Sequence, residues 1–203
     1  MRKKTMTQII QLKYGNTKCY LLKGTQKNLL IDTDWAGKLP QFFNELGKKH
    51  LKVQDIDYLL ITHYHPDHMG LTTDLMKLGV QLVIMDCQKD YVHQSDYIFQ
   101  KEKNPYFQPI DDQQAKQLNL SDSQYFLNQC GIGGKILSTP GHSIDSISVI
   151  LDSGEAFVGD LYPQEQVPLY HDKILSRSWQ NLISQGARFV YFAHYANEQV
   201  NLA

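Results

Sequence analysis

The chain has 203 residues with 20 basic and 21 acidic side chains, so its formal net charge of −1 creates no overall field that attracts nucleic acid or an anionic membrane surface. Hydrophobic residues make up 42% and charged residues 20%, a composition that excludes a disordered protein. This length fits one domain, 1–203, and no linker or repeat divides it.

The start of the sequence lacks the features of an export signal. Residues 1–4 are basic, but the segment 5–13 has too few consecutive apolar residues for a signal-peptide core. Elsewhere no run approaches the roughly 20 apolar residues that a membrane helix needs. The three cysteines are an odd number without close pairing, which predicts small buried thiols, no disulfide framework and a reducing, cytoplasmic location: Cys19, Cys87 and Cys130.

In the first half of the chain, short β-prone runs are bounded by turn residues. They predict strands at 9–14, 19–23, 28–31, 58–61 and 81–85. Apolar residues at helical spacing predict a helix over 38–47, with Gly47 as its C-cap. A second helix is expected from Asp67, as its N-cap, through Leu78.

The second half is less regular at first and then returns to strands. Residues 88–130 show no clear period, and the later strands are expected at 135–138, 146–151, 156–158 and 188–192, with a helix over 173–185. Strands cluster in each half with helices between them. This pattern predicts an α/β protein with two sheets packed together and covered by helices.

One short segment carries most of the chemical information. Three histidines and an aspartate fall within six residues, at His63, His65, Asp67 and His68, between a predicted strand and a predicted helix. Two residues apart on extended backbone, His63 and His65 point the same way. Asp67 and His68 lie where the chain turns into the helix, so their side chains face a second point in space, next to the one that His63 and His65 face. That geometry suits two adjacent metal ions better than one.

One loop cannot complete two metal sites, and the later sequence offers further ligands. His142 follows the strand at 135–138, Asp160 follows the strand at 156–158, and His194 follows the strand at 188–192. Strand ends at one sheet edge present their side chains to a shared cleft. A cluster this dense is a costly way to build a loop, because buried unpaired polar groups are unfavourable.

The ordered pattern His-x-His-x-Asp-His, Gly-His-Ser, Gly-Asp and a late Ala-His resembles that of the metallo-β-lactamase-like hydrolases. Order and strand-end placement match over nearly the whole chain, from about residue 9 to residue 194. The segment 16–20 also resembles a family segment near the site. The resemblance implies an α/β fold, the four-layer αβ/βα sandwich, with the metals at one edge of the two sheets.

The same resemblance implies two divalent metal ions, with zinc first and iron or manganese as alternatives. The implied ligands are His63, His65 and His142 for the first ion, Asp67, His68 and His194 for the second, and Asp160 as the bridge. A hydroxide bridging the two ions would act as the nucleophile, so no serine or cysteine is needed. Asp67 is also a candidate catalytic proton acceptor.

Two further residues are candidates outside the set of metal ligands. Asp32, at the end of an early strand, could orient a ligating imidazole, or it could simply cap the strand. His171 could line the cleft as a substrate contact, with a surface loop as the default reading. The remaining histidines, His50 and His93, are read as structural.

Residues 88–130 are the candidate specificity element. This segment carries seven aromatic rings and only four lysines against six acids, which suits a lid over a small, partly apolar substrate. Ordinary core or a dimer surface is an equal alternative, and an oligomer stays possible. The expected substrate is therefore a small ester, thioester or lactone, with a small phosphodiester second. Long nucleic acids and membranes are not expected as partners.

Two alternatives come from other classes of function. A mononuclear iron protein on this scaffold would oxidise a persulfide and consume oxygen. A non-catalytic binding protein could lose ligands freely, whereas all seven expected ligands are present here.

Overall fold

The computed structural model describes residues 7–201. Residues 1–4, weighed above as part of an export signal, lie outside this range. The strands are β1 (Gln8–Lys13), β2 (Lys18–Lys23), β3 (Asn28–Ile31), β4 (Tyr58–Leu60), β5 (Gln81–Met85), β6 (Lys116–Leu118), β7 (Gly134–Ser138), β8 (Ile147–Leu151), β9 (Glu155–Phe157), β10 (Phe189–Tyr191) and β11 (Glu198–Gln199). The α-helices are α1 (Leu39–Lys48), α2 (Pro66–Met69), α3 (Thr72–Lys77), α4 (Asp96–Lys101), α5 (Ser123–Cys130), α6 (Val167–Tyr170) and α7 (Lys173–Ser184). The short 3-10 helices are η1 (Val53–Asp55), η2 (Asp86–Tyr91), η3 (Asp112–Gln114), η4 (Leu120–Asp122) and η5 (Gln164–Gln166).

The strands form two mixed sheets. The first has the order β1-β2-β3-β4-β5-β6 and the second the order β11-β10-β9-β8-β7. In the first sheet β1, β2 and β3 pair antiparallel, and β3 through β6 pair parallel. In the second sheet only β9 and β10 pair parallel. Each sheet therefore combines hairpins with parallel strands whose carboxyl ends meet at one edge.

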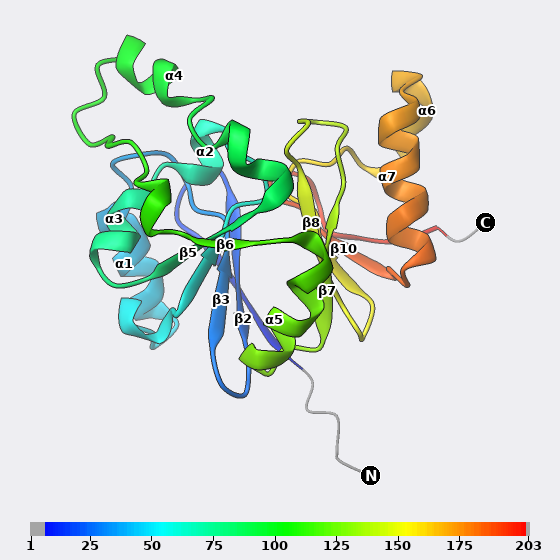
Figure 1. Ribbon diagram of the computed structural model, residues 1–203, viewed down its shortest axis with the longest axis horizontal. Coiled ribbons are helices and arrows are strands. Elements are labelled where there is room, and N and C mark those ends of the chain that lie inside the picture. The colour runs from blue at the N-terminus through cyan, green and yellow to red at the C-terminus, as the bar shows by residue number, and fades with distance from the viewer. Residues whose placement is uncertain (1–6, 202–203) are drawn as a thin grey trace.

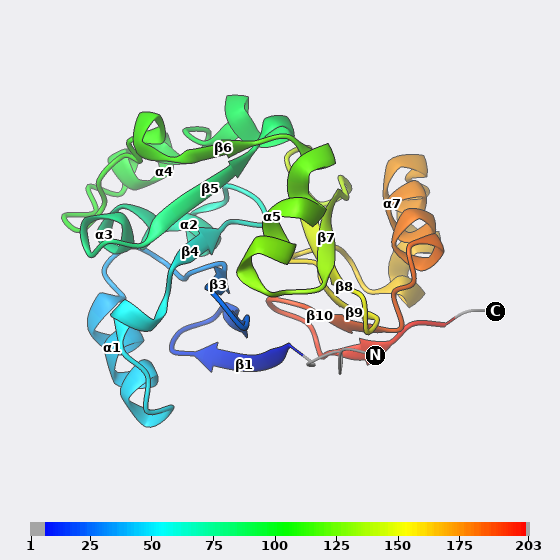
Figure 2. The same ribbon diagram turned by 60° about the horizontal axis from the view of Figure 1, so that its bottom comes forward.

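Three apolar cores define the layers. Alternate residues of one strand enter different cores: Leu30 packs with the outer helices α1 and α3, whereas Leu29 and Ile31 pack against the second sheet. The far face of the second sheet packs on α7 through Trp179 and Leu182. Figures 1 and 2 show α1 and α3 on one side, α7 on the other, and the strands between them. This arrangement confirms the predicted α/β four-layer sandwich.

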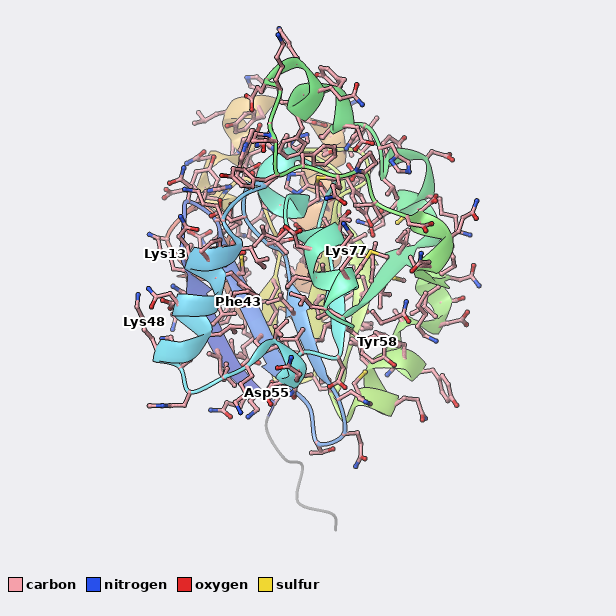
Figure 3. The ribbon with its side chains drawn as sticks, turned by 90° about the vertical axis from the view of Figure 1, so that its left-hand side faces the viewer. Lys13, Phe43, Lys48, Asp55, Tyr58 and Lys77 are labelled. Atoms are coloured by element: carbon pink, nitrogen blue, oxygen red, sulfur yellow. The ribbon has the colours of Figure 1, made fainter. Side chains whose placement is uncertain are left out.

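The outer helix α1 is amphipathic, with Phe42 and Leu46 buried against the first sheet. Figure 3 looks onto this layer and labels Phe43 and Lys48 on α1 and Lys77 on α3. The sequence predicted that α1 would end with Gly47 as its C-cap, and this was wrong. The helix runs to Lys48, and His50 takes the left-handed backbone with φ 57°.

The single helix predicted over 67–78 is two helices, α2 and α3. The carbonyl oxygen of His68 accepts hydrogen bonds from the backbone N–H and the hydroxyl of Thr33, each at 2.9 Å. In a continuous helix that oxygen would accept from the N–H of residue 72. The loop after β3 thus interrupts the helix and fixes α2 to the end of the first sheet.

The predicted strands are observed within two residues of their expected ends. Sequence analysis missed β6, β11 and the helices α4, α5 and α6. Four of these elements have at most six residues, too few to establish a period. No helix within residues 7–201 is long and apolar enough to cross a membrane.

Glycine at position 70 allows α2 to approach the loop after β3. A Cβ atom built there would lie 2.2 Å from the backbone nitrogen of Ala36, whereas a Cβ at Gly47 in α1 would meet nothing within 4 Å. We predict that Gly70→Ala lowers the free energy of unfolding in urea by about 1–3 kcal/mol, because backbone must shift. Gly47→Ala, the matched control, should raise it by up to about 1 kcal/mol. Equal effects of the two changes would contradict this close approach.

Candidate metal centre

The loop after β4 is held by buried carboxylates from both halves of the chain. Asp32 accepts hydrogen bonds from the backbone N–H of Thr62 at 2.7 Å and from its hydroxyl at 2.8 Å. Asp145 accepts the N–H of Tyr64 at 2.8 Å. The Tyr64 ring is fully buried in the outer core. Because side chains alternate along extended backbone, its neighbours His63 and His65 turn the other way, into the cleft.

Three imidazole nitrogens converge to form the first candidate site. His65 Nδ1 lies 3.1 Å from His63 Nε2 and 3.1 Å from His142 Nε2. Zinc binds such nitrogens at about 2.0–2.1 Å, so donors around one ion lie roughly 3.3 Å apart. His142 comes from the β7–β8 loop of the second sheet, and Figure 1 shows that loop and α2 at the same edge of the molecule.

The second candidate site lies beside the first. Asp67 Oδ2 is 3.0 Å from His194 Nε2, and Asp160 Oδ1 is 3.3 Å from His68 Nε2 and 3.4 Å from His194 Nε2. One ligand atom from each of the four residues lies within 4.8 Å of the others. His194 follows β10 and is held there because the N–H of Ala193 donates to the Gly159 carbonyl at 2.9 Å.

Asp160 faces both groups. Its Oδ1 is turned to the second group, while its Oδ2 lies 3.7 Å from His142 Nε2 and 3.9 Å from His63 Nε2. Gly159 brings it there with φ 58°, and a Cβ on that glycine would lie 2.3 Å from the Thr62 hydroxyl. The structure therefore brings together all seven residues that the sequence singled out as ligands.

Four of the seven candidate ligands, His63, His142, Asp67 and Asp160, have the protonation that a metal ion requires. Burial lowers the pKa of both His63 and His142, so their nitrogens are neutral. Burial opposes ionisation of Asp67, but the hydrogen bond with His194 and nearby positive charge lower its pKa to about 2. The Asp160 pKa is also lowered, because the interaction with His68 and the charges of neighbouring histidines outweigh burial. Neutral imidazoles and ionised carboxylates are metal ligands.

The other trend is seen at two histidines. Burial opposes protonation of His68, but Asp32 and Asp160 outweigh it and raise the pKa of His68, and the hydrogen bond with Asp67 raises the pKa of His194. A metal ion would therefore displace a proton from these imidazoles.

Two buried atoms at the centre lie 3.3 Å apart but form no hydrogen bond of good geometry. Within residues 7–201, His68 Nε2 and Asp160 Oδ1 are both shielded from solvent and have no hydrogen-bond partner of good geometry. Buried polar atoms are normally paired, and an exception needs an explanation. A cation between these atoms would satisfy both. The residues present thus fit a divalent metal ion.

Asp32 and His171 differ in where the structure places them. Asp32 Oδ2 lies 3.0 Å from His68 Nδ1, the contact expected of a carboxylate that orients an imidazole. His171 is exposed at the end of α6 with φ 51°. It is not among the residues that line the cleft, although its neighbour Asp172 is.

Asp145 and Gln88 were missed by the sequence analysis. Gln88 is fully buried and its Nε2 donates to the carbonyls of Ile61 at 2.9 Å and Asp145 at 3.2 Å. The signal available was an acid three residues after a candidate ligand in Gly-His-Ser-Ile-Asp. Thr17, in the segment that resembled a family motif, donates its hydroxyl to the Asp67 carbonyl at 2.7 Å.

The candidate specificity segment 88–130 divides into several parts. Its beginning supports the metal loop, since Ser95 donates its hydroxyl to the Tyr64 carbonyl at 2.6 Å. Phe99 is buried in the outer core and Phe126 between the sheets. Only Tyr91 and Gln94 of this segment line the cleft beside the metal centre. The role of a lid stays a prediction, and these two residues are the ones placed to carry it.

That cleft is a pocket of about 570 Å³ beside His142. Its apolar lining comes from Tyr91, Pro140, Ile144 and Ile174, and none of its lining residues is Lys or Arg. A pocket of similar volume, about 560 Å³, lies around Tyr58 and includes none of the seven candidate ligands.

Fold and site together define a class: a two-sheet sandwich whose strand ends carry a histidine and aspartate cluster suited to metal. The chain matches the metallo-beta-lactamase superfamily over residues 12–194, and it belongs to that superfamily.

Named relatives agree with this assignment. The chain is 28% identical to the "Beta-lactamase-like protein 2 homolog" of Drosophila melanogaster over 157 residues, which are 77% of this chain and 50% of that protein. It is 32% identical to an "Atrochrysone carboxyl ACP thioesterase" of Pseudocercospora fijiensis over 142 residues, 69% of this chain and 36% of that protein. The chain therefore spans half or less of the length of these relatives.

Solved structures show the same fold. A metallo-beta-lactamase family protein from Thermus thermophilus superimposes with a TM-score of 0.71 at 21% identity, covering 95% of this chain and 74% of that one.

The contact between Asp32 and His68 generates a prediction. Asp32→Asn removes the charge but keeps the shape, and asparagine tolerates the φ of 60° at this position. We expect affinity for the second metal ion to fall about 10–100-fold, because the His68 imidazole loses its anionic partner. Competition with a chelator would measure this in two binding steps. Unchanged affinity in both steps would contradict an orienting role for Asp32.

Proposed function

We propose that this protein is a metal-dependent hydrolase with a dinuclear centre. The proposed ligands are His63, His65 and His142 for one ion, Asp67, His68 and His194 for the other, and Asp160 between them. The observation that carries the proposal is the position of Asp160, whose two oxygens each face one group of donors. A carboxylate in that position is what a pair of ions about 3.5–4 Å apart requires.

Two ions held there would supply a water that ionises near neutral pH, together with positive charge for the oxygen that becomes negative as the bond breaks. The protein's own contribution is to fix the donors from both sheets in place. Asp67 is ionised, and 32% of its side chain is exposed to solvent. It is therefore the residue we propose to accept the proton that the attacking water loses.

The proposed substrate is a small ester, thioester or lactone. The absence of Lys and Arg from the residues that line the pocket beside His142 favours a neutral group there over the charged remainder of a phosphodiester. The relative from Pseudocercospora fijiensis is named a thioesterase, which supports the same choice. A small phosphodiester is the second candidate.

A mononuclear persulfide dioxygenase would use the same scaffold. Its iron would need only one set of ligands, whereas here a second group of four residues is assembled beside the first. A non-catalytic protein would have no need of either group. The dinuclear hydrolase accounts for both groups and for the shared Asp160.

Metal content and turnover test the proposal together. We expect protein purified without added metal to hold about two equivalents of zinc, or of mixed zinc, iron and manganese, and to hydrolyse simple acyl thioesters. Asp67→Ala should lower turnover at least about a hundredfold, by loss of a ligand and a proton acceptor, while keeping its urea unfolding midpoint. His50→Asn, remote from the ligands and tolerant of its φ of 57°, is the matched control.

The outcomes separate the alternatives. About one equivalent of iron, with oxygen uptake on a persulfide, would replace the hydrolase with the dioxygenase. Hydrolysis of a small phosphodiester but of no ester, thioester or lactone would correct the substrate class. Full turnover in Asp67→Ala would remove that residue from the mechanism.

A further inference from the structure

Exposed apolar side chains gather beside the first candidate metal site. Ile144 is 70% exposed and Ile174 is 53% exposed, and both line the pocket next to His142. On the adjoining α6, Leu169 is 75% exposed and Tyr170 45%. Large apolar side chains grouped at a cleft mark a surface that another apolar group covers.

The pocket is continuous with the candidate reaction centre through His142. This residue lines the pocket and also places its Nε2 3.1 Å from His65 Nδ1 in the first group of ligands. The ring of Tyr162 lies 5.7 Å from the His142 ring and stacks on Tyr170 at 4.1 Å between centroids. A chain attached to a carbonyl at the metal centre would therefore run past His142 into apolar surroundings.

The polar side chains that line the pocket disfavour a charged group of the substrate there. Among residues 7–201, the one carboxylate that lines it is Asp172, which caps α7 by accepting the N–H of Ile174 at 2.7 Å. With no Lys or Arg among the lining residues, a second carboxylate or a phosphate on the substrate would be desolvated without a partner.

We propose that this pocket binds the apolar acyl chain of the substrate, so that the protein acts on medium-chain acyl thioesters or esters in preference to acetyl ones. The proposal rests on the hydrolase function proposed above. Ile144 and Ile174 are the specificity-determining residues. The volume of about 570 Å³ lies within the range of small-molecule pockets.

The test compares acetyl, butanoyl, hexanoyl and octanoyl thioesters of one thiol. Each methylene that enters the pocket should raise kcat/KM about two- to fourfold, because burying a methylene contributes up to about 0.8 kcal/mol. Ile144→Ser and Ile174→Ser should each lower the ratio of the octanoyl to the acetyl rate constant by about tenfold. Leu78→Ser is the matched control, since Leu78 is 40% exposed and lies outside this pocket.

A binding measurement separates this proposal from the hydrolase proposal. Octanamide should bind the purified protein more tightly than acetamide by calorimetry, and Ile174→Ser should remove the difference. That result without turnover of any thioester, ester, lactone or phosphodiester would overturn the hydrolase and leave the pocket assignment standing. Hydrolysis with rates independent of chain length would overturn the pocket assignment alone. The pocket assignment would also be overturned if Ile174→Ser abolished a dimer without changing the chain-length preference.

A second inference rests on a different observation, the buried carboxylate of Asp145. Its side chain is fully buried, and its Oδ1 accepts hydrogen bonds from Ser143 Oγ and from Gln94 Nε2, the latter at 3.3 Å. Its Oδ2 accepts the N–H of Tyr64. No basic side chain contacts it in the described part of the chain.

These contacts join the two loops that carry the first group of ligands. Tyr64 lies between His63 and His65, and Ser143 directly follows His142. We infer that Asp145 is a positioning residue that fixes the distance between these loops and thereby the affinity of the first metal site. A buried carboxylate that accepts hydrogen bonds from both loops resists a change in their separation, because any movement would leave buried polar groups unpaired.

The test uses Asp145→Asn, which keeps the volume but can offer only one acceptor oxygen. We expect affinity for the first of two cobalt(II) ions, read from the visible absorption of the three-imidazole site, to fall about 10–100-fold. The other binding step should change less. Asp57→Asn, a carboxylate that accepts the N–H of Asn28 at 2.8 Å far from the ligands, is the control.

Urea unfolding of the metal-free protein distinguishes positioning from general stability. Ser143→Ala removes one of the donors and serves if Asp145→Asn does not fold. Equal weakening of both binding steps, or unchanged affinity in both variants, would overturn the positioning role.

Discussion

The candidate centre depends on one constraint: donors from two separate sheets must meet at a single carboxylate. His63, His65, Asp67 and His68 follow β4 of the first sheet, whereas the other three ligands follow β7, β9 and β10 of the second. Asp160 can face both groups only if the sheets keep a fixed separation. The apolar core between them, with Leu29, Ile31 and Val149, therefore supports the chemistry as well as stability.

Hydrogen bonds at the edge of the sandwich refine that separation. The N–H of Lys18 in the first sheet donates to the Ala193 carbonyl at 3.0 Å, next to His194. The N–H of Ile147 in the second sheet donates to the Thr62 carbonyl at 2.9 Å, next to His63. Hydrogen bonds have narrow distance and angle preferences, so these two bonds restrict the separation of the sheets next to the candidate ligands. The ligand loops are thus bonded across the interface.

Sequence reasoning reached the candidate ligands because local rules decide where they lie. Alternation along a strand put His63 and His65 on one side, and each later ligand directly follows a recognisable strand. The orienting role of Asp32 could be predicted for the same reason, because Asp32 also directly follows a strand. The helix break at Gly70 could not, because it depends on Thr33, far away in the sequence, taking the His68 carbonyl. Asp145 was missed because two of its side-chain partners, Tyr64 and Gln94, lie far from it in the sequence.

The charges at the centre point to the same conclusion as the geometry. Asp67 and Asp160 are ionised and close together, and His63 and His142 are neutral. These carboxylates raise the pKa of His68 and His194, so a cation that binds only the folded chain would take the place of protons there and stabilise the fold by mass action. The pocket beside His142 has the opposite character, apolar and without a base. The two ends of a neutral acyl group match these two environments. Its polar carbonyl would lie toward the charged centre and its chain toward Ile144 and Ile174.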